Sequence, residues 1–384
     1  MKICVATGTR AEYGLLKPLI DQISIEPDWQ LQLLVTGAHL SPEFGLTYLQ
    51  IENDGLKIDA KVEMLLSSDT AEGIVKSMGL GMIGYADAFK NLRPDLLIIL
   101  GDRYEMLAIA SAALIFKIPI AHLHGGEITE GAYDDAIRHA ITKMSHLHFT
   151  STEKYRQRVI QLGEQANCVF NVGAIGLDNL VDLKLMSKEV LEKELGIEFL
   201  RYNYKVAFHP ATLEQVSVAE QFQELLTAIS LQQESFFIFT KANADTGGRI
   251  INKMISEFVA KNPQKAAAFT SLGTLKFLSV LKVCEAIVGN SSSGIIEAPS
   301  LGIATINIGE RQKGRIQAES VVNSGVSAAE INAAFKQTRD QNFRARLPQV
   351  INPYGSGFVT QKIVEIIKAI NLKEHFVKKF NNLT

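Results

Sequence analysis

The sequence predicts an α/β protein made of two doubly wound parallel sheets that follow one another along the chain. Short apolar runs alternate with amphipathic stretches through most of the 384 residues. The apolar runs are nearly continuous, which is typical of parallel strands covered by helices on both faces. The chain is also longer than one hydrophobic core usually supports, so we expect two domains.

The apolar runs fall into two series that meet near residue 175. The expected strands are 2–6, 31–35, 95–100, 118–123, 146–150 and 168–173, then 205–208, 235–240, 266–270, 284–288 and 303–308. The expected helices include 13–25, 74–91, 104–117, 133–145, 151–162, 217–231, 247–261 and 274–283. We therefore predict a first domain at 1–174 and a second at 175–365. Residues 366–384 are expected to form helix, with a separate last helix at 371–380, and to pack back on the first domain.

Composition and charge exclude several classes of protein. Hydrophobic residues make up 47% of the chain and charged residues 21%, with a formal net charge of -2, as in ordinary globular proteins. There is no basic excess of the kind that nucleic acid binding requires, and no apolar run approaches the ~20 residues of a membrane span. The first apolar run is too short for a signal peptide, and three separated cysteines suggest reduced thiols, so we expect a cytoplasmic location.

Five of the eight histidines lie in residues 122–148. There, His124-Gly-Gly-Glu127 ends an expected strand, and the glycines let the backbone approach a ligand closely. On the next helix Asp134 and Arg138 are four residues apart and can meet on one face, which is also a common surface pairing. The stretch is therefore a candidate for proton transfer and anion binding.

A metal site is the rival interpretation of the same stretch. His146 and His148 resemble metal ligands, but they lie beyond the helix, and neither cysteine nor an H-E-x-x-H spacing accompanies them. We expect no metal.

Two further turns of the first domain contain candidate ligand-binding residues. Arg10 stands in Gly8-Thr-Arg-Ala-Glu-Tyr-Gly14, where a helix N-terminus and a guanidinium would suit a phosphate, although the G-x-G-x-x-G spacing is missing. Asp102 follows an apolar strand, either as a helix N-cap or as a carboxylate at the ligand-binding edge, with Arg103 beside it.

The second domain offers a similar set of strand ends. His209 follows one strand, and Asn243 lies in the turn after the next. The segment from Gly289 to Pro299 would form an anion cradle with its hydroxyls, with Glu297 three residues into the helix. Ligands of such sheets bind at the carboxyl ends of the strands, so we predict a site in the cleft between the domains.

A series of motifs resembles the UDP-hydrolysing UDP-N-acetylglucosamine 2-epimerases of sialic acid synthesis, in the same order along the chain. These motifs are Gly8–Gly14, Gly101-Asp-Arg103, His122–Phe149, His209-Pro210, Gly289-Asn-Ser-Ser292 and Arg311-Gln312 with Arg315. The resemblance implies a GT-B-like pair of Rossmann domains. It also implies conversion of UDP-GlcNAc and water to N-acetylmannosamine and UDP through a 2-acetamidoglucal, without NAD or a catalytic metal. We thus expect no cofactor.

The resemblance also implies roles for individual residues. Asp102 and Asp134 match acid/base positions, whereas His124 stands where many relatives carry Glu. The candidates for proton transfer are Asp102, His124, Glu127, Asp134 and His209. The candidates for binding UDP are Arg10, Arg103, Arg138, His209, Asn243, Ser291, Ser292, Glu297, Arg311 and Arg315, with Glu297 on the ribose.

The chemistry suits these residue types. Expulsion of UDP needs cations in a water-poor site, and epimerisation at C2 needs a base and an acid. The alternatives are hydrolytic epimerisation of UDP-N,N'-diacetylbacillosamine for legionaminic acid synthesis, a GT-B glycosyltransferase, and a nucleotide-sugar sensor without activity. The expected partner is a nucleotide-sugar, and a homodimer or homotetramer is expected by analogy.

Overall fold

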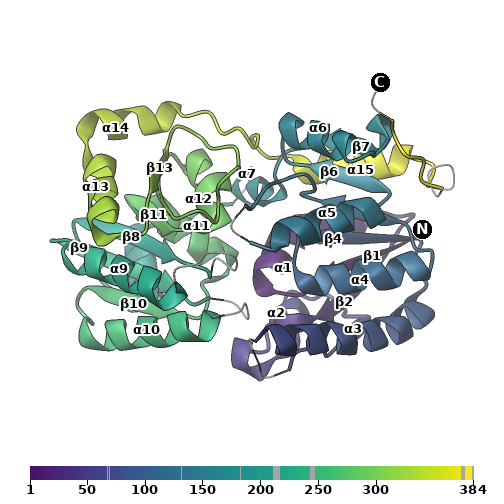
Figure 1. Ribbon diagram of the computed structural model, residues 1–384, viewed down its shortest axis with the longest axis horizontal. Helices are drawn as coiled ribbons and strands as arrows, with labels where there is room; N and C mark the ends of the chain where they lie inside the picture. Colours follow the sequence, from purple (N-terminus) through teal and green to yellow (C-terminus); the bar gives the residue numbers. More distant parts are fainter. Residues whose placement is uncertain are drawn as a thin grey trace. The chain divides into compact units, whose positions relative to one another are not determined.

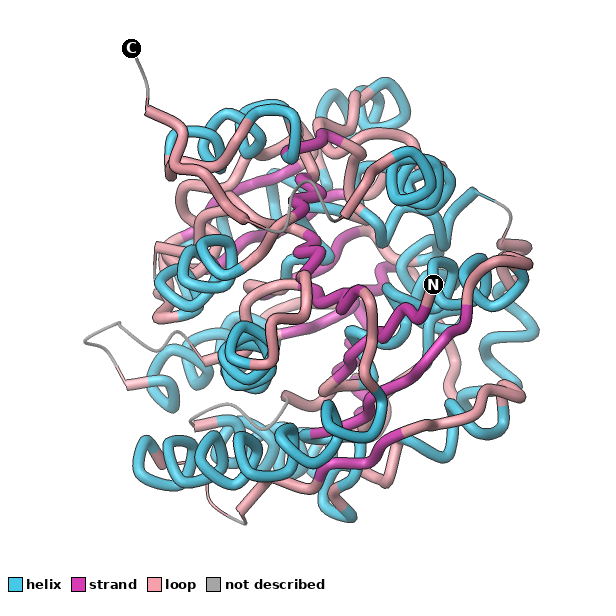
Figure 2. The backbone as a smooth tube through the Cα atoms, turned by 90° about the vertical axis from the view of Figure 1, so that its right-hand side faces the viewer, coloured by secondary structure: helices cyan, strands magenta, loops and turns pink. Residues whose placement is uncertain are grey.

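The computed structural model describes residues 1–66, 68, 70–130, 132–181, 183–210, 217–242, 247–372 and 377–382. The chain forms two compact units. The first comprises Met1–Glu127, Asp134–Val181 and Tyr354–Thr384, and the second comprises Ile128–Tyr133 and Asp182–Pro353. Each unit contains one parallel sheet with helices on both faces (Figures 1 and 2). The predicted pair of doubly wound α/β folds is confirmed.

The first unit has a sheet of seven strands in the order β3-β2-β1-β4-β5-β6-β7. The strands are β1 (Lys2–Thr7), β2 (Gln30–Thr36), β3 (Ala60–Val62), β4 (Leu96–Leu100), β5 (Ile120–Leu123), β6 (Leu147–Thr150) and β7 (Val169–Asn171). The helices are α1 (Arg10–Ile25), α2 (Tyr48–Asn53), α3 (Ala71–Leu92), α4 (Tyr104–Ile115), α5 (Asp134–Met144), α6 (Glu153–Gln161), α7 (Asp178–Val181) and α15 (Val359–Ala369).

Two apolar layers hold this sheet. Leu16 and Ile20 of α1 and Ile363 of α15 belong to the cluster on one face. Tyr85 of α3 and Ile109 of α4 belong to the cluster on the other face. Figure 1 shows α3, α4 and α5 lying together over that second face. The sheet is therefore buried on both sides, as its continuous apolar strands predict.

The second unit has a sheet of six parallel strands in the order β10-β9-β8-β11-β12-β13. The strands are β8 (Tyr202–Ala207), β9 (Ser235–Thr240), β10 (Ala266–Phe269), β11 (Ala286–Gly289), β12 (Ala304–Ile308) and β13 (Val321–Ser324). The helices are α8 (Lys188–Leu195), α9 (Val218–Ser230), α10 (Gly248–Lys261), α11 (Gly273–Val283), α12 (Ser292–Ile296), α13 (Ala328–Arg339) and α14 (Gln341–Arg346). Residues of α9, α10 and α13 cover one face, and residues of α8 and α11 the other.

Several sequence-based boundaries differ from the structure. The chain returns to the first unit at Tyr354, not at 366, because the Tyr354 ring is buried and its hydroxyl lies 3.1 Å from that of Tyr155. Ile128–Tyr133 already belong to the second unit, and the longer crossing into it follows Val181 rather than residue 174. The helix expected over 366–384 ends at Ala369, and residues 377–380 are not helical, so the separate last helix is wrong in the described part of the tail. The edge strands β3 and β13 were not predicted.

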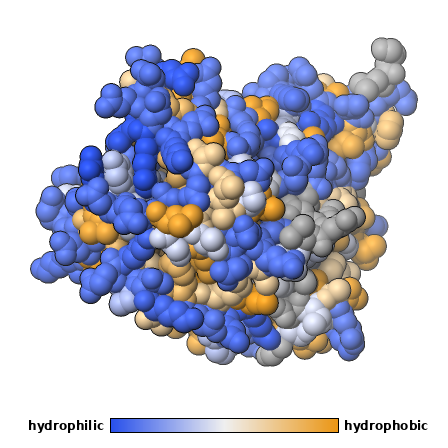
Figure 3. All heavy atoms as spheres, turned by 60° about the vertical axis from the view of Figure 1, so that its left-hand side comes forward, coloured by the Kyte–Doolittle hydropathy of each residue, from blue (hydrophilic) through white to orange (hydrophobic). Residues whose placement is uncertain are grey.

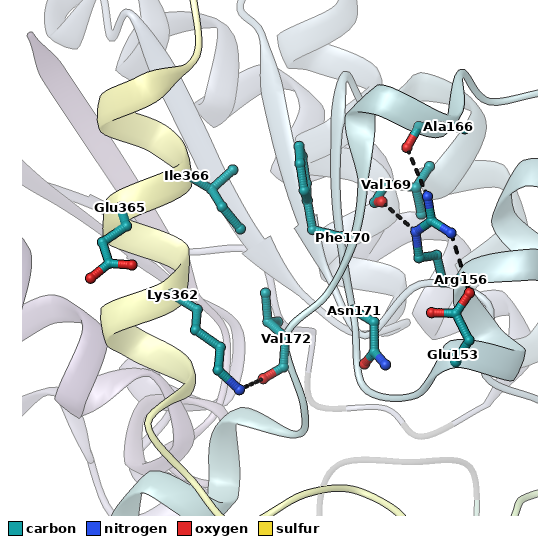
Figure 4. A pocket seen from close by; sticks show the side chains of 10 residues that line it. All are labelled: Glu153, Arg156, Ala166, Val169, Phe170, Asn171, Val172, Lys362, Glu365 and Ile366. Carbon is teal, nitrogen blue, oxygen red and sulfur yellow. Dashed lines mark hydrogen bonds and ion pairs between the residues drawn. The ribbon is translucent and has the colours of Figure 1, made fainter.

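The outer edge of the first sheet is protected by charged side chains. Beside β7 lies an open hollow of about 580 Å³, shown in Figure 4. Arg156 of α6 donates to the carbonyls of Val169, at 2.8 Å, and Ala166, at 3.2 Å, and Lys362 of α15 donates to the carbonyl of Val172 at 3.3 Å. Cations on outward carbonyls discourage pairing with a further strand. The hollow contains none of the predicted site residues.

The face of the molecule drawn in Figure 3 is mostly hydrophilic and the cysteines are unpaired, as we expected from the composition. On the face drawn in Figure 3, hydrophobic side chains form small patches among hydrophilic ones. Cys4, Cys168 and Cys284 are buried free thiols, as predicted. Among the helices of the described residues, none is both long and apolar enough to cross a membrane.

Candidate active site

Several predicted site residues follow the strands that flank a reversal of strand order in each sheet. In the first unit the order reverses between β1 and β4, which precede Arg10 and Asp102. In the second unit it reverses between β8 and β11, which precede His209 and Ser291. Open α/β sheets bind ligands at this switch point. Strand order therefore explains why these particular turns carry polar side chains.

The Arg138 side chain binds three residues of the first unit, which are Asp102, Glu127 and Asp135. Its side chain is only 1% exposed, and its Nη2 donates to Oδ2 of Asp102. Its Nη1 donates to Oδ1 of Asp135 at 3.0 Å and to the carbonyl of Glu127 at 2.8 Å. This buried guanidinium fixes Asp102 against the start of α5, where Asp134 is the first residue. On the same helix, His139 Nε2 lies 3.6 Å from Asp135.

His124 has an unusual backbone and a fixed tautomer. Its φ is 65°, in the left-handed region that few side chains adopt. Its Nε2 accepts a hydrogen bond from the Ile175 N–H at 3.2 Å, so the neutral ring carries its proton on Nδ1. That nitrogen lies 2.9 Å from Oε1 of Glu127, which also accepts from the Ser151 hydroxyl at 2.8 Å. His124 and the buried Glu127 therefore form an oriented dyad, and sequence reasoning missed Ser151.

The buried imidazole of His122 supports the loop that carries Asp102. His122 Nε2 donates to the carbonyl of Gly101 at 2.7 Å, and its Nδ1 lies 3.2 Å from the Thr142 hydroxyl on α5. Burial lowers the pKa of His122 to about 3, so the ring is neutral at physiological pH. His122 therefore links the end of β4 to α5 without carrying charge.

The turn after β1 differs from the sequence expectation. The helix N-terminus in this turn was expected to suit a phosphate, but the N–H groups of Gly8 and Thr9 both donate to Oε2 of Glu12, at 2.8 and 3.0 Å. Thr9 and Glu12 form a capping box, and Arg10 begins the helix. Burial raises the pKa of Glu12 to about 7.

The turn after β4 also holds an ion pair that the sequence did not reveal. Arg103, not Asp102, is the N-cap residue of α4. Its guanidinium donates to both carboxylate oxygens of Glu105, at 3.1 and 3.2 Å, and the Glu105 side chain is fully buried. The Arg103 fork is thus oriented by a carboxylate two residues away.

In the second unit Asn290 joins two strand ends. Its Oδ1 accepts from the His209 N–H at 2.7 Å, and its Nδ2 donates to the His209 carbonyl at 2.8 Å. The Asn290 carbonyl accepts from Arg311 Nη1 at 2.9 Å and from Gln312 Nε2 at 2.7 Å. This side chain therefore brings His209, Arg311 and the serine turn together. The only signal in the sequence for the role of Asn290 and Gln312 is that each has a side-chain amide and follows the end of an apolar strand.

The other predicted residues of the second unit that the structure describes lie at the two ends of helix α12 and in the loop after β12. Ser291 is the N-cap of α12 and accepts from the Ser293 N–H at 3.4 Å. Ser292 begins α12. Glu297 follows the last residue of that short helix, so it is a C-cap residue rather than part of the first turn. Arg315 Nε donates to the carbonyl of Ile128 at 3.3 Å. Asn243 lies outside the described residues.

The histidines considered as metal ligands have other contacts. His146 Nδ1 accepts from the Ile120 N–H, and His148 Nε2 lies 3.0 Å from Glu164. Over the described ranges, no three His, Cys, Asp or Glu side chains gather as a metal site would require.

Comparison with known proteins identifies the family. The family model described as UDP-N-acetylglucosamine 2-epimerase matches residues 21–368. The chain belongs to this family. A GDP/UDP-N,N'-diacetylbacillosamine 2-epimerase (hydrolyzing) of Campylobacter jejuni is 42% identical over 383 residues, covering 100% of this chain and 99% of the relative. A UDP-N,N'-diacetylbacillosamine 2-epimerase (hydrolyzing) of Legionella pneumophila is 33% identical over 382 residues, 99% of each chain.

A solved structure supports the fold. The UDP-GlcNAc 2-epimerase of Neisseria meningitidis bound to UDP-GlcNAc matches with a TM-score of 0.80, over 96% of this chain and 100% of that chain, at 18% identity. The GT-B-like fold implied by the motifs is thereby confirmed, as is the resemblance to the UDP-hydrolysing epimerase family.

Proposed function

We propose that this member of the epimerase family hydrolyses UDP-N,N'-diacetylbacillosamine with inversion at C2, releasing UDP and the 2-epimeric sugar. The observation that carries the proposal is the whole-length similarity to the Campylobacter and Legionella proteins, both of which are named for this activity. The sequence had favoured UDP-GlcNAc over this substrate. UDP-GlcNAc remains the second candidate, since the description of the family model names it.

The proposed reaction has two balanced steps. A base removes the C2 proton while the C1–O bond breaks, so that UDP leaves and a C1=C2 double bond forms. An acid then returns a proton to the opposite face of C2, and water adds at C1. We assign these proton transfers to Asp102, Asp134 and the His124–Glu127 dyad. The Arg138–Asp102 pair supports this assignment, because the buried guanidinium binds the Asp102 carboxylate beside the start of α5, the helix that begins with Asp134.

We assign nucleotide binding chiefly to the second unit. His209, Ser291, Ser292, Glu297, Arg311 and Arg315 are the proposed contacts there, and Arg10, Arg103 and Arg138 are proposed for the first unit. Positive charge directed at the leaving diphosphate would stabilise the charge that develops when C1–O breaks. The Asn290 bonds that fix His209 and Arg311 support this grouping. We propose that the reaction needs no cofactor.

Proton NMR in deuterated water, with a chelator and no acceptor, tests the reaction. We expect UDP and a 2-deuterated 2-epimeric sugar from UDP-N,N'-diacetylbacillosamine, at a rate at least about tenfold above that with UDP-GlcNAc. A preference for UDP-GlcNAc would establish the second candidate. If both sugars stay intact and undeuterated until an acceptor is added, the protein is a glycosyltransferase and the proposal is wrong.

The acid/base assignment has its own test. Asp134→Asn should lower turnover by at least about 100-fold, because the amide cannot exchange a proton with C2, while the affinity for UDP stays within about threefold. Asp87→Asn, on the exposed side of α3, is the matched control and should retain full activity. Near-normal turnover in Asp134→Asn would remove Asp134 from the mechanism.

A further inference from the structure

Residues 377–382, which we call the tail segment, dock on the first unit through several unlike contacts. The Asn381 N–H donates to the carbonyl of Gly163 at 2.8 Å, and the Lys379 carbonyl accepts from Gln165 Nε2 at 3.3 Å. The Phe380 ring covers Gly163 so closely that a Cβ there would collide with it. Gly163 also has a φ of 94°, so both its backbone conformation and the ring of Phe380 exclude a side chain at this position.

Lys378 extends from the tail segment to the end of α5. Its ammonium donates to the carbonyls of Lys143, at 2.7 Å, and Ser145, and it lies 3.5 Å from the carbonyl of Thr142. The last carbonyls of a helix have no partner within the helix, and a cation there interacts favourably with the helix dipole. Lys378 thus supplies, from more than 200 residues away in the sequence, a cap for the last turn of α5.

Glu164 fixes the same ammonium from the other side. Its carboxylate lies 2.8 Å from Lys378, 2.5 Å from Lys143 and 3.0 Å from His148 Nε2, with only 3% of its side chain exposed. Burial alone would raise the pKa of Glu164, but hydrogen bonds from His148, Lys143 and Lys378 lower it to about 2. The carboxylate is therefore charged at physiological pH, and a buried charge needs such partners.

Helix α5 connects this anchor to the proposed acid/base groups. The helix begins with Asp134, and Arg138 on it pairs with Asp102. Near its other end, Thr142 lies 3.2 Å from His122, which binds the carbonyl of Gly101 beside Asp102. A displacement of the last turn would thus reach Asp102 along two routes.

We propose that Lys378 is a positioning residue, which fixes the last turn of α5 and through it the placement of Asp134 and of the Arg138–Asp102 pair. The effect on turnover rests on the proposed function, whereas the effect on α5 does not. A misplacement of about 1 Å at reacting groups can cost on the order of 100-fold in rate.

The test compares three full-length variants. Lys378→Met keeps the length of the side chain and removes the ammonium, Lys378→Arg restores a cation, and Lys379→Met makes the same change at the neighbouring exposed lysine. We would measure hydrogen exchange of the α5 amides, kcat and KM for UDP release, and calorimetric UDP affinity, at a temperature where all variants are fully folded.

We expect Lys378→Met to exchange its α5 amides at least about tenfold faster and to lose at least about tenfold in kcat, with UDP affinity unchanged within about twofold. Lys378→Arg should recover most of both, and Lys379→Met should match the unaltered protein. Unchanged α5 exchange in Lys378→Met would overturn the proposal, and so would an equal loss of kcat and UDP affinity, which indicates general destabilisation. If the unaltered protein turns over neither UDP-sugar, the proposed function fails, and the α5 exchange alone decides the placement by Lys378.

Discussion

The carboxylates of Glu12 and Glu105 are both buried beside the turn after β1, and they differ in their hydrogen-bond partners. Glu105 is bound on both oxygens by Arg103. Glu12 accepts only backbone N–H groups on its Oε2, so burial dominates and the pKa of Glu12 rises to about 7. The folded protein therefore binds this proton more tightly than the unfolded chain does.

That difference predicts a dependence of stability on pH. Because the folded-state pKa lies above the ordinary value of 4.5, Glu12 contributes its full stabilisation below about pH 4.5 and loses it as the pH rises through 7. Glu12→Gln should remove this component, which is on the order of a few kcal/mol, while the amide oxygen retains the hydrogen bonds from the backbone.

The measurement is the free energy of unfolding from urea titrations between pH 4.5 and 8, for the unaltered protein, Glu12→Gln and the exposed control Glu63→Gln. We expect a flatter profile in Glu12→Gln alone. Parallel profiles for all three proteins would show that Glu12 does not titrate in this range.

Single residues could be located from the sequence only where a strand end marks them. Asp102, His124 and His209 became candidates because each follows an apolar run, and parallel strands bring such ends to one edge. The contacts around them were not predicted, since the Arg138–Asp102 pair, the bond of Ser151 to Glu127 and the Asn290 bonds to His209 depend on side-chain directions and on long-range packing. Spacing therefore predicted which residues gather but not what they bind.

At the scale of elements, the end of β11 shows how closely two strands can approach. Gly289 has a φ of 130°, and a Cβ there would collide with the carbonyl oxygen of Ala207 at the end of β8. The next residue, Asn290, makes the paired bonds to His209. The glycine therefore permits the contact on which the proposed nucleotide site depends.

Gly289→Ala should consequently lower the free energy of unfolding by about 3 kcal/mol or more and weaken UDP binding at least about tenfold. Gly55→Ala is the matched control, because Gly55 also has a positive φ, 79°, but open space around it. The difference between the two variants in urea denaturation isolates the close approach from the backbone strain. Equal losses would show that the contact with Ala207 relaxes at no cost.

The sequence predicted those strands and helices that are long or contain a continuous apolar run. Central strands such as β4 and β9 are continuous apolar runs, whereas the edge strands β3 and β13 have only three and four residues and carry Lys61 and Asn323. A polar residue in so short a strand leaves no apolar run to recognise, whereas the opposite edge strands β7 and β10 lie within the predicted runs 168–173 and 266–270. Within the described part of 371–380, residues 377–380 are not helical, because Lys378 and Phe380 make tertiary contacts that the helical spacing of apolar residues does not reveal.

For the whole molecule, the sequence indicated two domains but not the path of the chain between them. The first unit contains residues from both ends of the sequence, and Ile128–Tyr133 belong to the second unit although their neighbours belong to the first. Such crossings depend on contacts over long sequence separations, for which composition carries no signal.

A shortened chain tests this division. A protein ending at Pro353 lacks α15 and Tyr354, so the core residues Leu16 and Ile20 of α1 lose their cover. We expect hydrogen exchange to show native protection in β8 and β11 and a loss of protection in β1 and β4. Uniform protection, or uniform loss, would contradict the two-unit organisation.

The return of Tyr354–Thr384 to the first unit also sets an order of events during synthesis on the ribosome. Chains usually complete their N-terminal domain first, while the rest is still being made. Here the second unit receives its last residue at Pro353, whereas the first still awaits α15 and the tail segment. The unit that is translated first therefore finishes folding after the second, and the part of its apolar sheet face that α15 covers stays open to chaperones until α15 has been made.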